Sequence, residues 1–206
     1  MPDINISYQW MINLCNAANT GYSQSYRRGQ TVNGITYYDC SSAISAALTA
    51  GGFFTRNPWF TTSTMRTFLQ QAGFQSVNIG TRWLPGDIVW RSGHCEMVYQ
   101  SGGDTGGGVT MGAHSSDRPL DEQISINNYV STPDMYTELW RYGGGATGLT
   151  WISGNYYLDN TQMQNNAYVQ YSDLYAKGWT RNAIAGLLGN EQVESTINPG
   201  VWQNLD

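Results

Sequence analysis

The sequence predicts an α+β fold in which N-terminal helices pack on an antiparallel sheet, followed by a short all-α C-terminal segment. Three observations lead to this prediction. Helical spacing of apolar residues dominates residues 1–72, short strands separated by turns follow within residues 84–142, and helical spacing returns after residue 160.

The first expected helix covers residues 7–18, where Trp10, Leu14 and Cys15 recur at three- and four-residue spacing. Cys15 lies on that apolar face, so we assign it to the core. Residues 19–36 are polar and contain three glycines. We expect them to form a long loop that serves as one wall of a binding site.

A second helix is expected to begin at Cys40. Asp39 is a typical N-cap residue, and Gly51-Gly52 ends the helix. Cys40 therefore lies in the first turn, where the helix dipole and unpaired backbone N–H groups favour a thiolate. This position suits a nucleophile, and a buried structural cysteine is the alternative. A short helix at about residues 62–72 follows.

Alternating patterns predict the strands of the sheet, at residues 88–90, 94–99, 109–114, 123–127 and 136–142. His94 opens the second of these strands and His114 closes the third, so a hairpin could bring the two histidines of the chain together. A thiolate nucleophile needs a general base, and the base needs a third group to orient it. Glu96 shares a strand face with His94 and is the reserve candidate for the orienting role.

A zinc site is the alternative interpretation of these residues. The adjacent His94 and Cys95 cannot easily reach one metal from a regular strand, and the chain has no CxxC or HxxxH spacing. We therefore favour the catalytic interpretation over a zinc site, while the residues alone support catalysis and a purely structural role about equally.

Composition narrows the classes of partner. The 206 residues carry a net charge of −5, which argues against nucleic acid as the main partner. No apolar run approaches a membrane span, so we expect no membrane insertion. The N-terminus lacks the features of a signal peptide. Three widely spaced cysteines argue against a disulfide framework.

The C-terminal part begins after a glycine-rich linker, residues 143–150. Thr161 and Thr180 are candidate caps of two helices, and the second helix is expected to break at residues 198–200. We expect residues 151–206 to form a separate helical unit.

Three motifs carry a family resemblance: residues 39–42 around Cys40, residues 84–89 (Leu-Pro-Gly-Asp-Ile-Val) and Gly93-His94. Together they resemble the papain-like cell-wall hydrolases. More closely, they resemble the cysteine peptidoglycan hydrolases of phages of Gram-positive bacteria, relatives of the NlpC-type and CHAP enzymes. The resemblance covers about residues 5–142 and implies a papain-like domain at residues 1–142.

In that family the helix-start cysteine is the nucleophile, the strand-start histidine is the base, and a polar residue on the next strand orients the base. The resemblance thus assigns these roles to Cys40, His94 and His114. This sequence departs from the family pattern at Cys95-Glu96, where the family usually has small apolar residues. Tyr22, Tyr38 and Asp39 are assigned to substrate binding, the first from its likeness to the family's substrate wall.

Residues 151–206 resemble the beginning of a phage tail lysozyme domain. In that family the glutamate before a serine is the catalytic acid, which corresponds to Glu194. Two helices cannot enclose a sugar-binding cleft, so we expect this domain to be cut short at Asp206 and to lack glycosidase activity.

The resemblances imply a phage lysin that cuts amide bonds of bacterial peptidoglycan, as a monomer or as part of a larger lysin. The chemistry requires no cofactor, and no clear acidic loop offers a calcium site. We expect synthesis in the host cytoplasm, then holin release or transport on a virion tail. The alternatives are a non-catalytic wall-binding or tail structural module, an acyl-transfer enzyme of the same fold, and lysis driven mainly by the lysozyme-like part.

Overall fold

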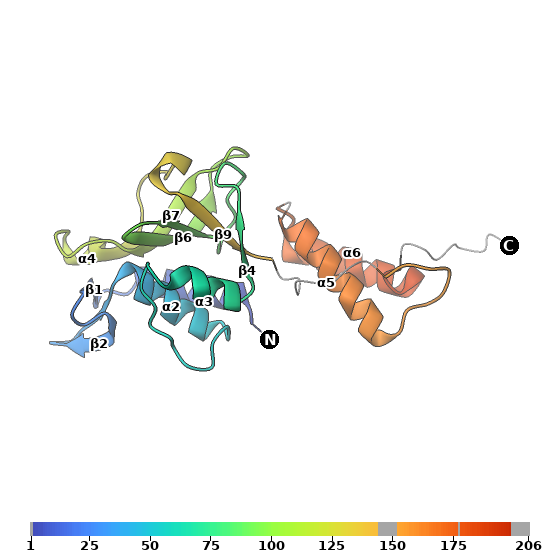
Figure 1. The fold of residues 1–206 in the computed structure, drawn as a ribbon, viewed down its shortest axis with the longest axis horizontal. Helices are drawn as coiled ribbons and strands as arrows, with labels where there is room; N and C mark the ends of the chain where they lie inside the picture. Colours follow the sequence, from blue (N-terminus) through green and yellow to red (C-terminus); the bar gives the residue numbers. More distant parts are fainter. Residues whose placement is uncertain (1, 144–151, 177, 199–206) are drawn as a thin grey trace. The chain divides into compact units, whose positions relative to one another are not determined.

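The computed structural model describes residues 2–143, 152–176 and 178–198 (Figure 1). The chain divides into two compact units, Met1–Tyr142 and Gly143–Asp206. The predicted α+β class is confirmed, because the first unit combines helices with a large antiparallel sheet. No helix in the described ranges is long and apolar enough to cross a membrane.

The first unit is organised around a six-stranded antiparallel sheet with the strand order β4-β9-β5-β6-β7-β8. The strands are β4 (Phe74–Val77), β5 (Ile88–Arg91), β6 (His94–Ser101), β7 (Gly108–Ala113), β8 (Ile124–Ile126) and β9 (Glu138–Tyr142). Strands β5 to β8 form the expected meander. Strand β9 returns to pair with β5, and β4 was not predicted.

Helices α1 (Ile4–Cys15) and α2 (Cys40–Ala50) lie against one face of this sheet, with α3 (Met65–Gln71) beside them (Figure 1). Their apolar side chains and those of β5–β7 form one continuous core, in which Ile44, Leu48 and Met97 are fully buried. Burying this surface is the main stabilising contribution to the unit. Two short helical segments precede the last two strands in the sequence: α4 (Leu120–Gln123) comes before β8, and η1 (Pro133–Met135) comes before β9.

The expected long loop at residues 19–36 is wrong in part. This stretch contains β1 (Thr20–Tyr22), β2 (Arg28–Val32) and the start of β3 (Ile35–Tyr38), which form a small sheet. Strands β2 and β3 are joined at Asn33-Gly34, whose φ values are 52° and 80°. Asn-Gly is the preferred pair for such a tight hairpin turn.

Two helix starts also differ from the prediction. Helix α1 begins at Ile4 rather than at residue 7, because the Asp3 side chain accepts the backbone N–H of Asn5 and caps it. In the second unit, α5 (Asn160–Ala176) begins before Thr161. Asp159 instead accepts the backbone N–H of Gln162 at 2.8 Å.

The second unit also contains α6 (Arg181–Ser195), which Thr180 caps as predicted by accepting the backbone N–H of Ala183. Asn166 of α5 is fully buried and donates to the carbonyl oxygens of Ile152 and Ile197, at 2.7 and 2.8 Å. These bonds tie the start and the end of the described unit to α5. The predicted linker beyond residue 143 and the predicted break at residues 199–200 lie outside the described residues.

Candidate active site

Cys40 occupies the first position of α2 and is 4% exposed. Asp39 caps the helix: its carboxylate accepts the backbone N–H of Ser42 at 2.7 Å, and the Ser42 hydroxyl accepts the backbone N–H of Asp39 at 2.9 Å. This reciprocal capping box fixes the chain direction at the helix start. The Cys40 thiol therefore has a defined position at the positive end of the helix dipole.

Arg27 holds the β1–β2 segment against this helix start. Its guanidinium pairs with the Asp39 carboxylate and donates to the Ser41 hydroxyl at 3.0 Å and to the Phe60 carbonyl at 2.6 Å. The Arg27 and Asp39 side chains are 14% and 5% exposed. The small sheet, α2 and the loop before α3 are thus joined by one largely buried cation.

His94 opens β6 directly after a two-residue turn, and it pairs across that turn with Arg91. The turn requires Gly93, which has a φ of 80°. Helix α2 packs on β6, so Cys40 of the helix and Cys95 of the strand belong to the same core cluster. The side chains of Cys40 and His94 interact, and each shifts the pKa of the other.

The contacts of Cys40 favour its thiolate. A hydrogen bond from the Cys95 thiol and then the bond to His94 lower the pKa of Cys40 from 9.0 to about 5, although burial acts in the opposite direction. Burial raises the pKa of Cys40 but lowers that of His94. Hydrogen bonds to Cys40 and Glu96 outweigh the effect of burial on His94 and raise its pKa to about 9. Between these two values the pair is a thiolate and an imidazolium.

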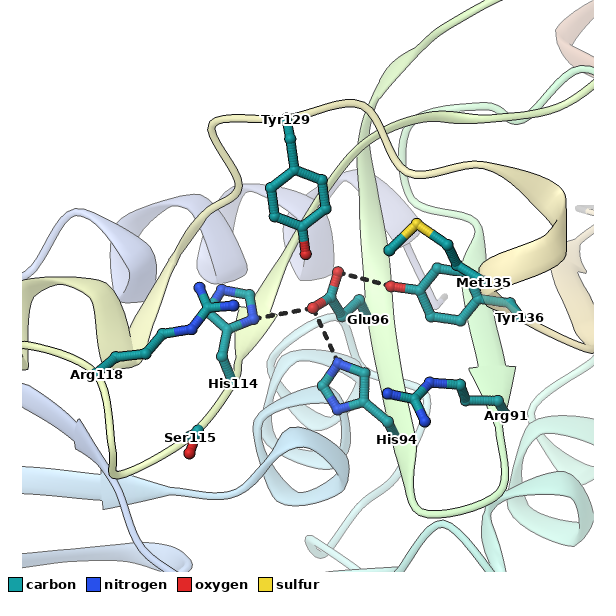
Figure 2. A pocket seen from close by; sticks show the side chains of 9 residues that line it. All are labelled: Arg91, His94, Glu96, His114, Ser115, Arg118, Tyr129, Met135 and Tyr136. Atoms are coloured by element: carbon teal, nitrogen blue, oxygen red, sulfur yellow. Dashed lines mark hydrogen bonds and ion pairs between the residues drawn. The ribbon is translucent and has the colours of Figure 1, made fainter.

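Glu96 is the centre of the hydrogen-bond network around His94 (Figure 2). Its Oε1 lies 2.9 Å from both His94 Nε2 and His114 Nδ1. Its Oε2 accepts from the Tyr136 hydroxyl and the Asn127 amide, each at 2.9 Å, and from the Thr110 hydroxyl. Glu96 is 1% exposed. Burial raises its pKa, but the bonds from both histidines dominate and hold that pKa well below its usual range.

His114 follows the end of β7 and reaches His94 only through the shared oxygen of Glu96. Its second ring nitrogen, Nε2, lies 3.1 Å from the carbonyl oxygen of Ser125. A carboxylate and a carbonyl are both acceptors, so both bonds form together only when each ring nitrogen carries a proton.

His94, Glu96 and His114 could also hold a metal ion, because one ligand atom from each lies within 4.8 Å of the others. His94 Nε2 and His114 Nδ1 both face Glu96 Oε1, and the hydrogen bonds there need N–H protons. A metal ion would have to replace these protons to bind the same nitrogens. Arg91 and Arg118 line the same pocket and add positive charge. The residues therefore fit a hydrogen-bonded catalytic network better than a cation site.

The remaining predicted site residues lie in different environments. Tyr22 is half-buried, and its hydroxyl accepts from the Gln24 amide. Tyr38 is half-buried with its ring edge-on to Trp10 at 5.8 Å, and Asp39 is buried as the helix cap. In the second unit, Glu194 is exposed on α6.

Sequence reasoning missed the groups that hold Glu96: Thr110 on β7, Asn127 after β8 and Tyr136 before β9. It also missed the contact of Cys95 with Cys40. None of these residues belongs to a local motif, because their contacts join separate strands.

Comparison with known proteins places these features in a family. Residues 3–147 match the model of the bacteriophage peptidoglycan hydrolases, and residues 165–206 match that of the phage tail lysozymes. Over 54 residues, 26% of the chain, the sequence is 57% identical to morphogenesis protein 1 of Bacillus phage B103. That match spans only 15% of the relative's length. The match to the peptidoglycan hydrolase model covers most of the chain. The chain therefore belongs to the bacteriophage peptidoglycan hydrolase family.

Proposed function

We propose that the chain is a cysteine hydrolase that cuts amide bonds in the peptide part of bacterial peptidoglycan, as an amidase or an endopeptidase. The observation that carries this proposal is the contact of Cys40 with Cys95 and His94. The Cys95 thiol and then His94 lower the pKa of Cys40 to about 5, and Cys40 and Glu96 raise the pKa of His94 to about 9. A thiolate beside an imidazolium is the resting state that a cysteine nucleophile requires. The family supplies the substrate class.

In the proposed reaction, the Cys40 thiolate attacks the amide carbonyl carbon and forms a tetrahedral oxyanion. In this proposal, backbone N–H groups at the start of α2, including that of Cys40, stabilise the oxyanion. His94 gives its proton to the leaving amine as the C–N bond breaks, which leaves a thioester on Cys40. His94 then takes a proton from water as the water oxygen attacks the thioester carbon. The C–S bond breaks, the carboxylic acid product leaves, and the Cys40 thiolate and the His94 imidazolium are restored.

We assign the orienting role to Glu96 and not to His114, because Glu96 is the residue that contacts the imidazole of His94. The family resemblance assigned the orienting role to His114, with Glu96 as the alternative, and we now propose a supporting role for His114. It fixes the carboxylate by sharing Oε1, while Thr110, Asn127 and Tyr136 fix Oε2. Glu96 is thereby held in one rotamer, which positions His94 for proton transfer.

We propose a papain-like arrangement for the first unit, because a helix-start cysteine packs against a strand-start histidine of an antiparallel sheet. Tyr22 and Tyr38 are proposed to contact the substrate from the small sheet. Asp39 acts on Cys40 through the helix cap, since its carboxylate is bonded to Arg27, Ser41 and Ser42.

For the second unit we propose a lysozyme-like helical segment without glycosidase activity. Glu194 is exposed, and a glycosidase acid needs an enclosed site that raises its pKa. The lytic activity is therefore assigned to the first unit.

Clearing of bacterial cell walls by paired cysteine variants tests the proposal. Cys40→Ala should abolish clearing while the protein remains folded. Cys15→Ala is the matched control and should keep it, because burial raises the pKa of Cys15 to about 12 and leaves it unreactive. Clearing that survives Cys40→Ala would overturn the mechanism.

A further inference from the structure

The pocket beside His94 contains cationic groups that the proposed mechanism does not use. It has a volume of about 190 Å³. Its floor is the His94–Glu96–His114 network, and its walls include Arg91, Arg118 and Tyr129 (Figure 2).

The acceptor at the floor of the pocket is already saturated. Both oxygens of Glu96 are occupied, one by two histidines and the other by three donors. The carboxylate therefore has little capacity left for a ligand's N–H or O–H group. A ligand has to be recognised by the groups of the wall.

The free groups of the wall are donors. In the part of the chain that the structure describes, neither Arg91 nor Arg118 has a carboxylate partner. Four other arginines each form an ion pair: Arg27, Arg66, Arg82 and Arg141. Tyr129 is 39% exposed, and in Figure 2 its hydroxyl points into the pocket. Two guanidinium groups and a phenol around one cavity match an anion such as a carboxylate.

We infer that this pocket is a subsite for a free carboxylate of the peptide substrate, bound by Arg91 and Arg118 with Tyr129 as a further donor. The inference rests on the proposed function. His94 contacts Cys40 and also lines the pocket, so a carboxylate bound here lies one imidazole ring away from the thiol. The subsite would thereby position the peptide for attack and select among stem peptides by their charge.

Two synthetic stem peptides test the inference. They are identical except that the second residue is D-isoglutamate, with a free carboxylate, or D-isoglutamine, with a carboxamide. The full-length protein should cleave the carboxylate form with a kcat/KM about tenfold or more higher, as expected for charge-assisted bonds, mainly through a lower KM. The double variant Arg91→Gln/Arg118→Gln should cleave both peptides equally.

Arg56→Gln is the matched control, because Arg56 is exposed and lies outside the pocket. It should keep the preference of the unchanged protein. A preference that persists in the double variant, or equal cleavage of both peptides by the unchanged protein, would overturn the inference.

Binding to the inactive Cys40→Ala protein, measured by calorimetry, separates this inference from the proposed function. If no peptide is cleaved by any variant, the proposed function fails, and tighter binding of the carboxylate peptide that depends on Arg91 and Arg118 still supports the subsite. Glycerol phosphate represents the phosphate polymers of the wall. Tighter binding of glycerol phosphate than of the carboxylate peptide would overturn the assignment to a peptide.

Discussion

Replacing Glu96 with glutamine removes the negative charge beside His94 and keeps the size of the side chain. The structure can accommodate the new amide. Asn127 Oδ1 is buried without a hydrogen-bond partner among the described residues, so turning the Asn127 amide over would give the new N–H group an acceptor. The hydroxyls of Thr110 and Tyr136 can rotate to accept as well. We therefore expect Glu96→Gln to fold.

The expected effect follows from the lost charge. A hydrogen bond to a charged group contributes about 1.5–3 kcal/mol and a neutral one about 0.5–1.5 kcal/mol, so the imidazolium of His94 loses about 1–1.5 kcal/mol. The His94 side chain is only 17% exposed, which limits screening by solvent. This loss corresponds to about one pKa unit. The pKa of His94, about 9 in the unchanged protein, should fall toward 8.

The pH dependence of kcat/KM on a soluble wall peptide measures this shift. The unchanged protein should be active between an acid limit near 5, where Cys40 takes up a proton, and an alkaline limit near 9, where His94 loses one. In Glu96→Gln the alkaline limit should move down by about one unit, so kcat/KM should fall by up to about tenfold above pH 9 and change little near pH 7. Glu122→Gln, the same change at an exposed position, is the control. An unchanged alkaline limit and rate in a folded Glu96→Gln protein would refute the role of Glu96.

Three further changes test other parts of the account. Cys95→Ala removes the hydrogen bond that most lowers the pKa of Cys40, so the midpoint of Cys40 alkylation by iodoacetamide should rise from about 5 toward neutral pH, and an unmoved midpoint would contradict the contact. Arg141 forms an ion pair with Asp87, whose side chain is only 3% exposed. Arg141→Met removes the charge that balances this carboxylate and should cost about 3–5 kcal/mol in the free energy of unfolding by urea. A loss under about 1 kcal/mol would show that this buried pair matters little. The Cys40→Ala protein should release no new reducing sugar from cell walls, whereas release that disappears in Glu194→Gln would show glycosidase activity in the second unit.

Local signals were sufficient to predict where Cys40 and His94 lie in their elements. Asp39 is an N-cap, and Gly93 marks the turn that starts β6. Strand alternation also placed Glu96 on the face of His94, where the structure has it. The small sheet was missed although Asn33-Gly34 carries a hairpin signal, because the polar residues of β2 suggested a loop.

The rest of the network could not be predicted because its contacts are long-range. Thr110, Asn127 and Tyr136 lie 14, 31 and 40 residues from Glu96. Only the strand order of the sheet brings them to one carboxylate. The same holds for the pocket, because its two arginines without a carboxylate partner come from the end of β5 and from the segment before α4.

Mass spectrometry of the fragments released from purified peptidoglycan tests the central claim most directly. Digestion by the unchanged protein should create one new amino group and one new carboxyl group per cut, at a single type of amide bond and without new reducing ends. The Cys40→Ala protein should release none of these fragments, and Cys15→Ala should release all of them. Amide cleavage that persists in Cys40→Ala, or cleavage that produces only new reducing ends, would contradict the account.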